Sequence, residues 1–209
     1  DISVELKEGL NKIKDTLLAE HEGLFVDLVN DLIRKIELYG NYFASLDIRQ
    51  DSRVLRKVHA FCRQNKPISS LYPADYDKLS EAEKLKHISF KEASINFASA
   101  PDELTKDTIE TINEIKGIQK RNGERACHRF IISNCQQASD ILQLMNLFLW
   151  CGWTKENLTV DFLPLFETIN DLKQAAGVME KLYTHPIYKE HLARRGNRQM
   201  IMLGFSDST

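Results

Sequence analysis

The sequence predicts an α/β fold, mostly helical overall, with about four parallel strands arranged as a partial β/α (TIM-type) barrel. Two observations lead to this prediction. Short apolar runs alternate with amphipathic helical segments, which is typical of parallel strands joined by helical crossovers. The chain has 209 residues, whereas a closed eight-stranded barrel usually takes about 250. Four strands are half of such a barrel.

We therefore expect residues 1–209 to be a single fragment of a larger catalytic barrel domain, with a helical lead-in at 1–40 and the partial barrel at 41–209. Apolar residues in the lead-in recur at helical spacing (Leu6, Leu10, Ile13, Leu17, then Phe25, Leu28, Leu32, Ile36). Gly40 is placed to end the second of these helices, as a glycine after the last turn commonly does.

The partial barrel is predicted to contain strands at 42–48, 128–134, 159–167 and 199–205. Helices are predicted at 52–64, within 76–87, and from Pro101 to about Gly117. Three more are expected: one capped by Ser139 and stopped by Gly152, one capped by Asn170, and one beginning at Pro186.

Charge and cysteine usage exclude several classes of function. The net charge is −2 and the basic residues are scattered, so nothing indicates a nucleic-acid partner or an anionic membrane surface. No apolar run approaches the roughly 20 residues of a membrane helix, and the first residues lack the features of a signal peptide. The four cysteines form no CxxC pair and are interpreted as small buried hydrophobes in a reducing cytoplasm.

Charged residues follow three of the predicted strands. Asp47, Arg49 and Asp51 close the first strand, Glu167 the third, and Asp207 the fourth. Active sites of parallel α/β folds lie at the carboxyl ends of the strands. Glu167 and Asp207 are one strand-helix-strand unit apart and supply two hard oxygen donors suited to Mg²⁺ or Mn²⁺, while Arg49 offers a planar fork for phosphate or carboxylate.

Structural interpretations of the same residues stay open. Either acid could cap a helix, and Arg49 could pair with Asp47 or Asp51. His59 and His128 lie beside apolar residues and are expected in the core or at its rim. The serines have no histidine at a motif spacing. The basic loop with Arg194, Arg195 and Arg198 is expected to be solvated, with anion binding as the lesser alternative.

Three blocks resemble the phosphoenolpyruvate carboxylase family: "LDIRQDS", "LPLFETINDLKQAAGVMEKL" and "QMIMLGFSDST". The resemblance runs collinearly from about Tyr42 to the end. It implies an enzyme built around an eight-stranded β/α barrel, which carboxylates phosphoenolpyruvate with bicarbonate to oxaloacetate and phosphate. It also implies that Glu167 and Asp207 bind the metal and that Arg49 contacts the substrate phosphate.

The resemblance further implies which functional groups this sequence lacks. The family's catalytic histidine would precede Asp1, and its lysine would follow Thr209, as would its glycine-rich arginine loop. We therefore expect a central fragment that is inactive by itself and, with strand edges exposed, a homo-oligomer. The alternatives are a fragment of another Mg²⁺-dependent barrel lyase acting on an enolpyruvate or keto acid, and a non-catalytic interaction module.

Overall fold

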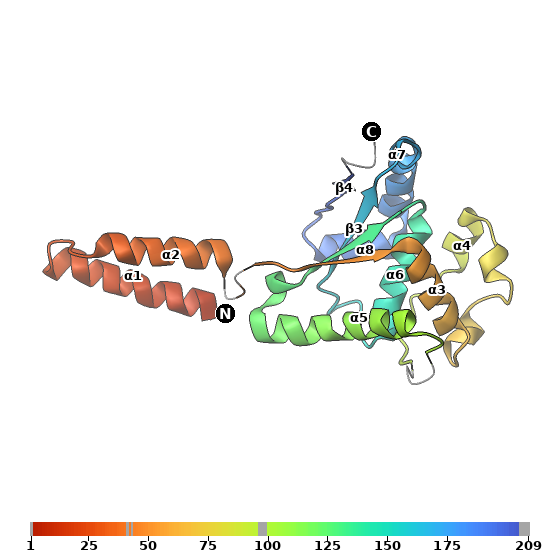
Figure 1. Cartoon of the computed structure of the whole chain (residues 1–209), viewed down its shortest axis with the longest axis horizontal. Helices are drawn as coiled ribbons and strands as arrows, with labels where there is room; N and C mark the ends of the chain where they lie inside the picture. The colour runs from red at the N-terminus through yellow and green to blue at the C-terminus, as the bar shows by residue number, and fades with distance from the viewer. Residues whose placement is uncertain (1, 41, 43, 96–99, 205–209) are drawn as a thin grey trace. The chain divides into compact units, whose positions relative to one another are not determined.

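The computed structural model describes residues 2–40, 42, 44–95 and 100–204. The chain divides into two compact units, one comprising Asp1–Leu46 with Gly117–Cys127 and the other Asp47–Lys116 with His128–Thr209. Helices α1 (Ile2–Glu20) and α2 (Val26–Tyr39) belong to the first unit, and the parallel sheet lies in the second (Figure 1). The prediction of a mostly helical chain with four parallel strands is confirmed.

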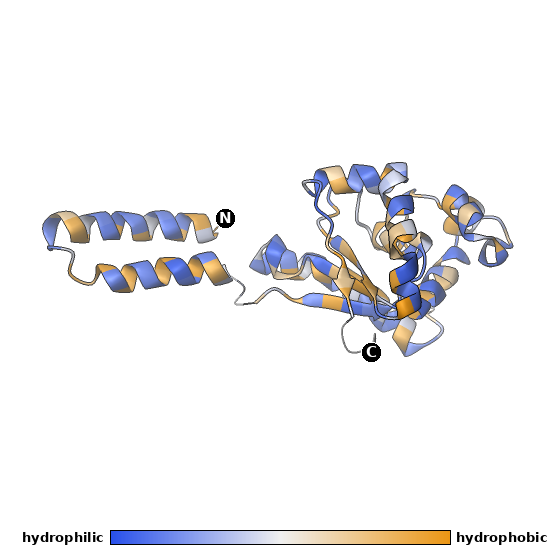
Figure 2. Cartoon of the chain, turned by 90° about the horizontal axis from the view of Figure 1, so that it is seen from above, coloured by the Kyte–Doolittle hydropathy of each residue, from blue (hydrophilic) through white to orange (hydrophobic). Residues whose placement is uncertain are grey.

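Helices α1 and α2 form a hairpin that buries little of its apolar surface. Leu10 and Ile36 are the buried residues of the two helices, whereas other members of the predicted stripes are exposed, including Leu6, Ile13 and Leu28. Hydrophobic residues recur along both helices in Figure 2. Gly40 ends α2 as predicted, with a φ of 56° that a side chain would strain.

The sheet of the second unit has the order β1-β2-β3-β4. Its strands are β1 (Asp47–Asp51), β2 (Arg129–Ser133), β3 (Asp161–Phe166) and β4 (Met202–Leu203), all paired in parallel. Each strand pairs with the next one along the chain, which is the arrangement that right-handed helical crossovers produce.

Two predicted strands have the wrong bounds. The first is predicted at 42–48 but begins at Asp47 and continues to Asp51, and the fourth is reduced to Met202–Leu203. Residues 41, 43 and 205 lie outside the described residues. Alternate residues of β1 are charged, and each has its own ion-pair partner: Arg129 for Asp47, Glu167 for Arg49 and Arg53 for Asp51. An apolar run therefore does not mark this strand.

The predicted helices are all present. They are α3 (Ser52–Arg63), α4 (Glu81–His87), α5 (Glu103–Asn122), α6 (Ala138–Trp150), α7 (Ile169–Thr184) and α8 (Pro186–Arg194). Short 3₁₀ turns occupy Ile68–Leu71, Tyr76–Lys78 and Glu124–Ala126. Helix α5 continues past the predicted end at Gly117, because a glycine in mid-helix weakens a helix without breaking it.

Two predicted N-caps are wrong. The N-cap of α6 is Gln137 rather than Ser139, because the Ser139 hydroxyl donates instead to Glu81, 2.6 Å away. The N-cap of α7 is Thr168 rather than Asn170: its hydroxyl accepts from the Asp171 amide, and the Asp171 carboxylate accepts from the Thr168 amide. This reciprocal pair is a capping box.

Helices α6 and α8 pack against one face of the sheet. Phe148 of α6 meets Phe130 and Phe162 edge to face, with ring centroids 5.8 Å and 5.3 Å apart, and His191 of α8 lies 5.3 Å from Phe162. Phe130 and Phe162 are register partners, so they point to the same side of the sheet. Every residue of α6 is buried, which makes this helix the centre of the core.

His59 of α3 is a core residue, as expected. Its ring stacks on Trp150 at 4.8 Å, and Nε2 lies 3.3 Å from the Asn146 side-chain oxygen. The Arg63 guanidinium donates to the other ring nitrogen, Nδ1. Burial and then the Arg63 charge lower the pKa of His59 to about 3, so the imidazole is neutral with its proton on Nε2.

No described helix is both long enough and apolar enough to cross a membrane.

Candidate active site

Arg49 and Glu167 form an ion pair at the carboxyl-end side of the sheet. Arg49 Nη2 lies 2.7 Å from Glu167 Oε1. The Glu167 side chain is 17% exposed and that of Arg49 is 53% exposed. The carboxylate is therefore recessed, and the guanidinium extends toward solvent. Arg49 does not pair with its sequence neighbours: Asp47 pairs with Arg129 and Asp51 with Arg53.

The strand register explains why these two residues meet. Arg49 is aligned with Ile131, and Ile131 with Leu163, so all three point to the face opposite the helices. Glu167 is two alternations beyond Leu163 and lies on that same face. Ile131, Leu163 and Leu165 form a buried apolar cluster. This cluster is the floor beneath the ion pair, and a low local dielectric strengthens charge interactions above it.

Strand β4 passes directly against Glu167. The Gly204 amide donates to the Phe166 carbonyl oxygen, 2.9 Å away. A Cβ placed on Gly204 would lie 3.0 Å from Glu167 Cα. The end of β4 therefore lies beside Glu167. Asp207, the other predicted metal ligand, follows three residues later and lies outside the described residues.

Metal ligation by Glu167 and Asp207 stays a prediction. Within residues 2–40, 42, 44–95 and 100–204, no group of three or more His, Cys, Asp or Glu side chains could hold a metal ion. Glu167 fits the role of a single hard oxygen donor, because it is recessed at the strand ends and lies against a backbone that leads to a second carboxylate.

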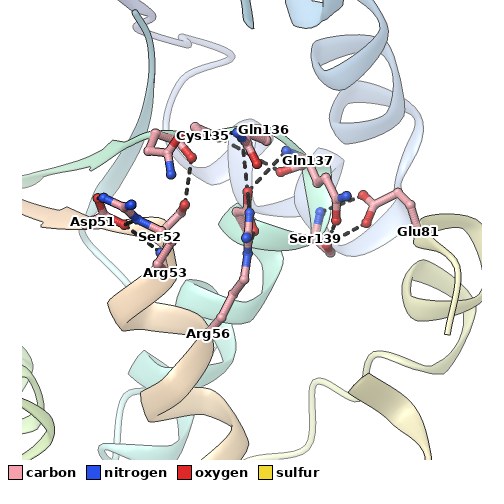
Figure 3. A network of polar contacts seen from close by, with 11 residues as sticks. Asp51, Ser52, Arg53, Arg56, Glu81, Cys135, Gln136, Gln137 and Ser139 are labelled. Atoms are coloured by element: carbon pink, nitrogen blue, oxygen red, sulfur yellow. Dashed lines mark hydrogen bonds and ion pairs between the residues drawn. The ribbon is translucent and has the colours of Figure 1, made fainter. Parts of the chain in front are cut away.

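Polar contacts fix the loop after β2, at the same end of the sheet (Figure 3). The Arg56 guanidinium donates to both Asp140 oxygens at 2.7 Å and 2.9 Å. Asp140 is 1% exposed, and one of its oxygens also accepts from the amides of Gln136 and Gln137. The hydrogen bonds to Asp140 raise the pKa of Arg56. The carboxylate thus ties the loop after β2 and the start of α6 to Arg56 of α3.

The same network connects three helices. Ser52, at the start of α3, donates to the Asn134 carbonyl oxygen at 2.6 Å. Glu81 of α4 accepts from the amide and the hydroxyl of Ser139 in α6 at 2.9 Å and 2.6 Å (Figure 3). Negative charge at a helix N-terminus is stabilised by the helix dipole. These contacts join residues that are 82 and 58 positions apart in the sequence. No local sequence pattern predicts them.

Asp51 is the N-cap of α3. It accepts from the Arg53 amide at 2.7 Å and from the Arg53 guanidinium at 3.0 Å and 2.8 Å. Hydrogen bonds from the Arg53 side chain hold the pKa of Asp51 below its ordinary value. Asp51 therefore caps a helix and pairs with Arg53 rather than with Arg49.

The remaining candidates have structural roles. Arg195 donates to Asp161 at 2.7 Å, and Arg194 pairs with Glu190 at 2.6 Å. The prediction that this loop is simply solvated is wrong for Arg195, whose side chain is 15% exposed. His128 lies 3.9 Å from Asp161. All four cysteines are free thiols, and three of them are buried.

Comparison with known proteins identifies a family that matches nearly the whole chain. The family model described as phosphoenolpyruvate carboxylase matches residues 2–209. A phosphoenolpyruvate carboxylase of Prochlorococcus marinus (strain MIT 9312) is 33% identical over 216 residues, covering 98% of this chain and 21% of the relative. That of Gloeobacter violaceus is 35% identical over 189 residues, covering 85% of this chain and 19% of the relative. The chain thus spans about a fifth of the length of these relatives.

Proposed function

Because the chain belongs to the phosphoenolpyruvate carboxylase family, we propose that it supplies part of the active site of an enzyme that carboxylates phosphoenolpyruvate with bicarbonate. The products are oxaloacetate, a precursor for the tricarboxylic acid cycle, and phosphate. The single observation that carries the proposal is the Arg49–Glu167 pair, which gathers an anion-binding and a cation-binding side chain at the strand ends.

Arg49 binds the substrate phosphate. Its guanidinium has a planar fork that matches phosphate oxygens, and the side chain is more than half exposed above the apolar floor. In the absence of substrate this cation rests on Glu167. When the phosphate arrives, Arg49 turns to it and neutralises charge on the phosphoryl group during transfer.

Glu167 and Asp207 are the proposed ligands of Mg²⁺ or Mn²⁺. Both are hard oxygen donors, the type that these cations prefer. When bound, the cation supplies Lewis-acid stabilisation of the negative charge that develops on the enolate oxygen. The two carboxylates belong to the segments that follow β3 and β4, which are paired strands.

The reaction proceeds in two stages. An oxygen of bicarbonate attacks phosphorus and the bond from phosphorus to the enol oxygen breaks, giving carboxyphosphate and the enolate of pyruvate. Carboxyphosphate then releases CO₂ and phosphate, and the enolate carbon attacks CO₂ to form oxaloacetate. Arg49 holds the phosphoryl group through the first stage. The buried floor of Ile131, Leu163 and Leu165 keeps water away from one side of the enolate.

We also propose that the sheet is part of an eight-stranded barrel in a cytoplasmic homo-oligomer. Among the strands that the structure describes, β1 pairs only with β2, and β4 only with β3. Unpaired edges favour further strand pairing, which the rest of a longer polypeptide would supply. The isolated 209-residue chain, which carries Arg49 and Glu167 without the family's histidine and lysine, is proposed to be inactive.

The test is a coupled assay for oxaloacetate. A full-length carboxylase carrying this sequence should form oxaloacetate from phosphoenolpyruvate in proportion to added bicarbonate, and the 209-residue chain should give no turnover above background. Both proteins must be free of host carboxylase. Turnover by the isolated chain would refute its inactivity, and a full-length protein that releases phosphate without forming oxaloacetate would refute the carboxylase function.

A further inference from the structure

Gly204 lies where the backbone at the end of β4 meets Glu167. We propose that Gly204 is a positioning residue for the cation site: its missing side chain lets the backbone lie against Glu167 and hold that carboxylate in place for a divalent cation. The proposal rests on the proposed function, because it assigns the Glu167 carboxylate to the cation.

A side chain at position 204 would crowd Glu167, which would have to give way by a few tenths of an ångström. A Cβ there would lie 3.0 Å from Glu167 Cα, 3.0 Å from its Cγ and 3.2 Å from its Cβ. Ordinary contacts between carbon atoms are about 3.5–4.0 Å. One of the obstructing atoms, Glu167 Cα, is backbone, so rotating the Glu167 side chain does not relieve the overlap.

Space, rather than backbone conformation, is what favours glycine here. The φ angle of Gly204 lies outside the left-handed region, whereas Gly123 has a φ of 88° and no atom within 4 Å of the position that a Cβ would take. These two glycines therefore serve different purposes. Gly123 satisfies a conformation that L-residues avoid, and Gly204 satisfies a close contact with one particular acid.

A hydrogen bond prevents β4 from sliding out of the way. The Gly204 amide donates to Phe166 at 2.9 Å, and Phe166 is fully buried. Moving position 204 away from Glu167 would break this bond and leave a buried carbonyl oxygen unsatisfied. A methyl group would therefore shift Glu167 by a few tenths of an ångström, and with it the carboxylate that contacts Arg49.

The expected effect is a loss of cation affinity rather than a loss of fold. Residues that orient a metal ligand typically change metal affinity by about 10–100-fold when replaced. We expect Gly204→Ala to weaken Mn²⁺ binding within that range. Gly177→Ala is the matched control, because Gly177 lies in α7 with no atom within 4 Å of the position of an added Cβ.

The experiment measures Mn²⁺ binding by electron paramagnetic resonance in the full-length carboxylase carrying this sequence, without substrate. The proteins are the parent, Gly204→Ala, Gly177→Ala, Glu167→Gln and the Glu167→Gln/Gly204→Ala double variant. If Gly204 acts through Glu167, the two substitutions are not additive. The double variant should then bind Mn²⁺ no more weakly than Glu167→Gln alone, while Gly177→Ala should bind like the parent.

The outcomes separate this inference from the proposed function. If Glu167→Gln leaves Mn²⁺ affinity unchanged, the assignment of Glu167 to the cation fails. If Glu167→Gln abolishes binding but Gly204→Ala behaves like Gly177→Ala, only the positioning role fails. Additive losses in the double variant would also overturn it, since they would mean that Gly204→Ala weakens binding by a route other than Glu167.

Discussion

The guanidinium of Arg49 and the carboxylate of Glu167 lie 2.7 Å apart although β2 separates their strands. In the absence of a ligand, the guanidinium and the carboxylate therefore form an ion pair with each other. A cation that takes Glu167 leaves Arg49 available for an anion, and an anion that takes Arg49 leaves Glu167 available for a cation. Such coupling is reciprocal by thermodynamic linkage, and it makes Arg49 the most informative residue to change.

Arg49→Lys should raise the KM for phosphoenolpyruvate while leaving the fold intact. Lysine keeps the charge but loses the planar fork. A hydrogen bond to a charged group contributes about 1.5–3 kcal/mol, so we expect an increase of about tenfold to a hundredfold. Steady-state kinetics of the full-length enzyme at saturating Mg²⁺ measures it.

Arg53→Lys is the control for that substitution. Arg53 belongs to the same end of the sheet and is also ion-paired, but its partner is Asp51. The KM should change little, because the Arg53 ion pair does not involve Glu167. The fold should be kept as well, because an exposed ion pair contributes at most about 1 kcal/mol to stability. Equal effects of the two substitutions would contradict a specific role for Arg49 in phosphate binding.

Asp140→Asn should destabilise the chain strongly. The carboxylate is buried, pairs with Arg56 and accepts from two backbone amides. The Arg56 guanidinium left behind is 36% exposed, so the cost is that of the lost hydrogen bonds to a charged group, about 1.5–3 kcal/mol. Asp31→Asn breaks an exposed pair with Arg34 and should change the free energy of unfolding by less than about 1 kcal/mol. Urea unfolding measures both, and similar values for the two would disprove the role of Asp140.

His59 should make the chain less stable in mild acid. Its pKa is about 3 in the folded state against 6.5 in the unfolded state. The unfolded chain therefore binds more protons between these values, and stability falls as pH drops below 6.5. The loss attributable to His59 is about 2 kcal/mol at pH 5.

The measurement is the free energy of unfolding at pH 7 and pH 5. His59→Gln, which cannot titrate, should show a smaller fall than the parent chain. His21→Gln is the control, because His21 is exposed and its surroundings change little on unfolding. An equal fall in the parent and in His59→Gln would show that His59 does not determine the acid sensitivity.

The order of the helices and strands can be predicted from the sequence, and so can the choice of Arg49 and Glu167 as candidate site residues. Hydrophobic periodicity and the residues that follow a strand are both local signals. The sequence is insufficient at β1, where the ion-paired residues Asp47 and Arg49 interrupt the apolar pattern that marks a strand. The Thr168–Asp171 capping box has a readable spacing, but Asn170 is also a favoured cap residue, and composition alone does not decide between the two.

Contacts between distant segments could not be predicted. The bond from Ser139 to Glu81 spans 58 positions, and nothing near either residue indicates its partner. Gly204 is similar: a glycine at the end of an apolar run suggests a turn, and only the neighbouring strand shows that it makes room for Glu167.

The isolated 209-residue chain should self-associate through its sheet edge. Met200, Ile201, Met202 and Leu203 are consecutive, apolar and each at least 40% exposed, and unpaired edges invite strand pairing. Light scattering across a dilution series should give a mass above that of a monomer. Leu203→Lys should lower this mass, because a charge blocks edge pairing.

Ile169→Lys is the matched control for edge pairing. Ile169 is as exposed as Leu203 but lies in the first turn of α7, so its substitution should leave the mass unchanged. A monomer at micromolar concentration, in the unsubstituted chain and without binding of a dye specific for exposed apolar surface, would rule out self-association.

The segments after β3 and β4 are proposed to carry the two metal ligands of a carboxylase, Glu167 and Asp207. The most direct test titrates Mg²⁺ against turnover in the full-length enzyme with Glu167→Gln and, separately, with Asp207→Asn. Both swaps are nearly isosteric, so folding should be preserved. We expect each to lower turnover about 100-fold or more and to raise the Mg²⁺ concentration needed for half-maximal activity. Normal activity of either variant at the Mg²⁺ concentration that the parent requires would contradict the claim.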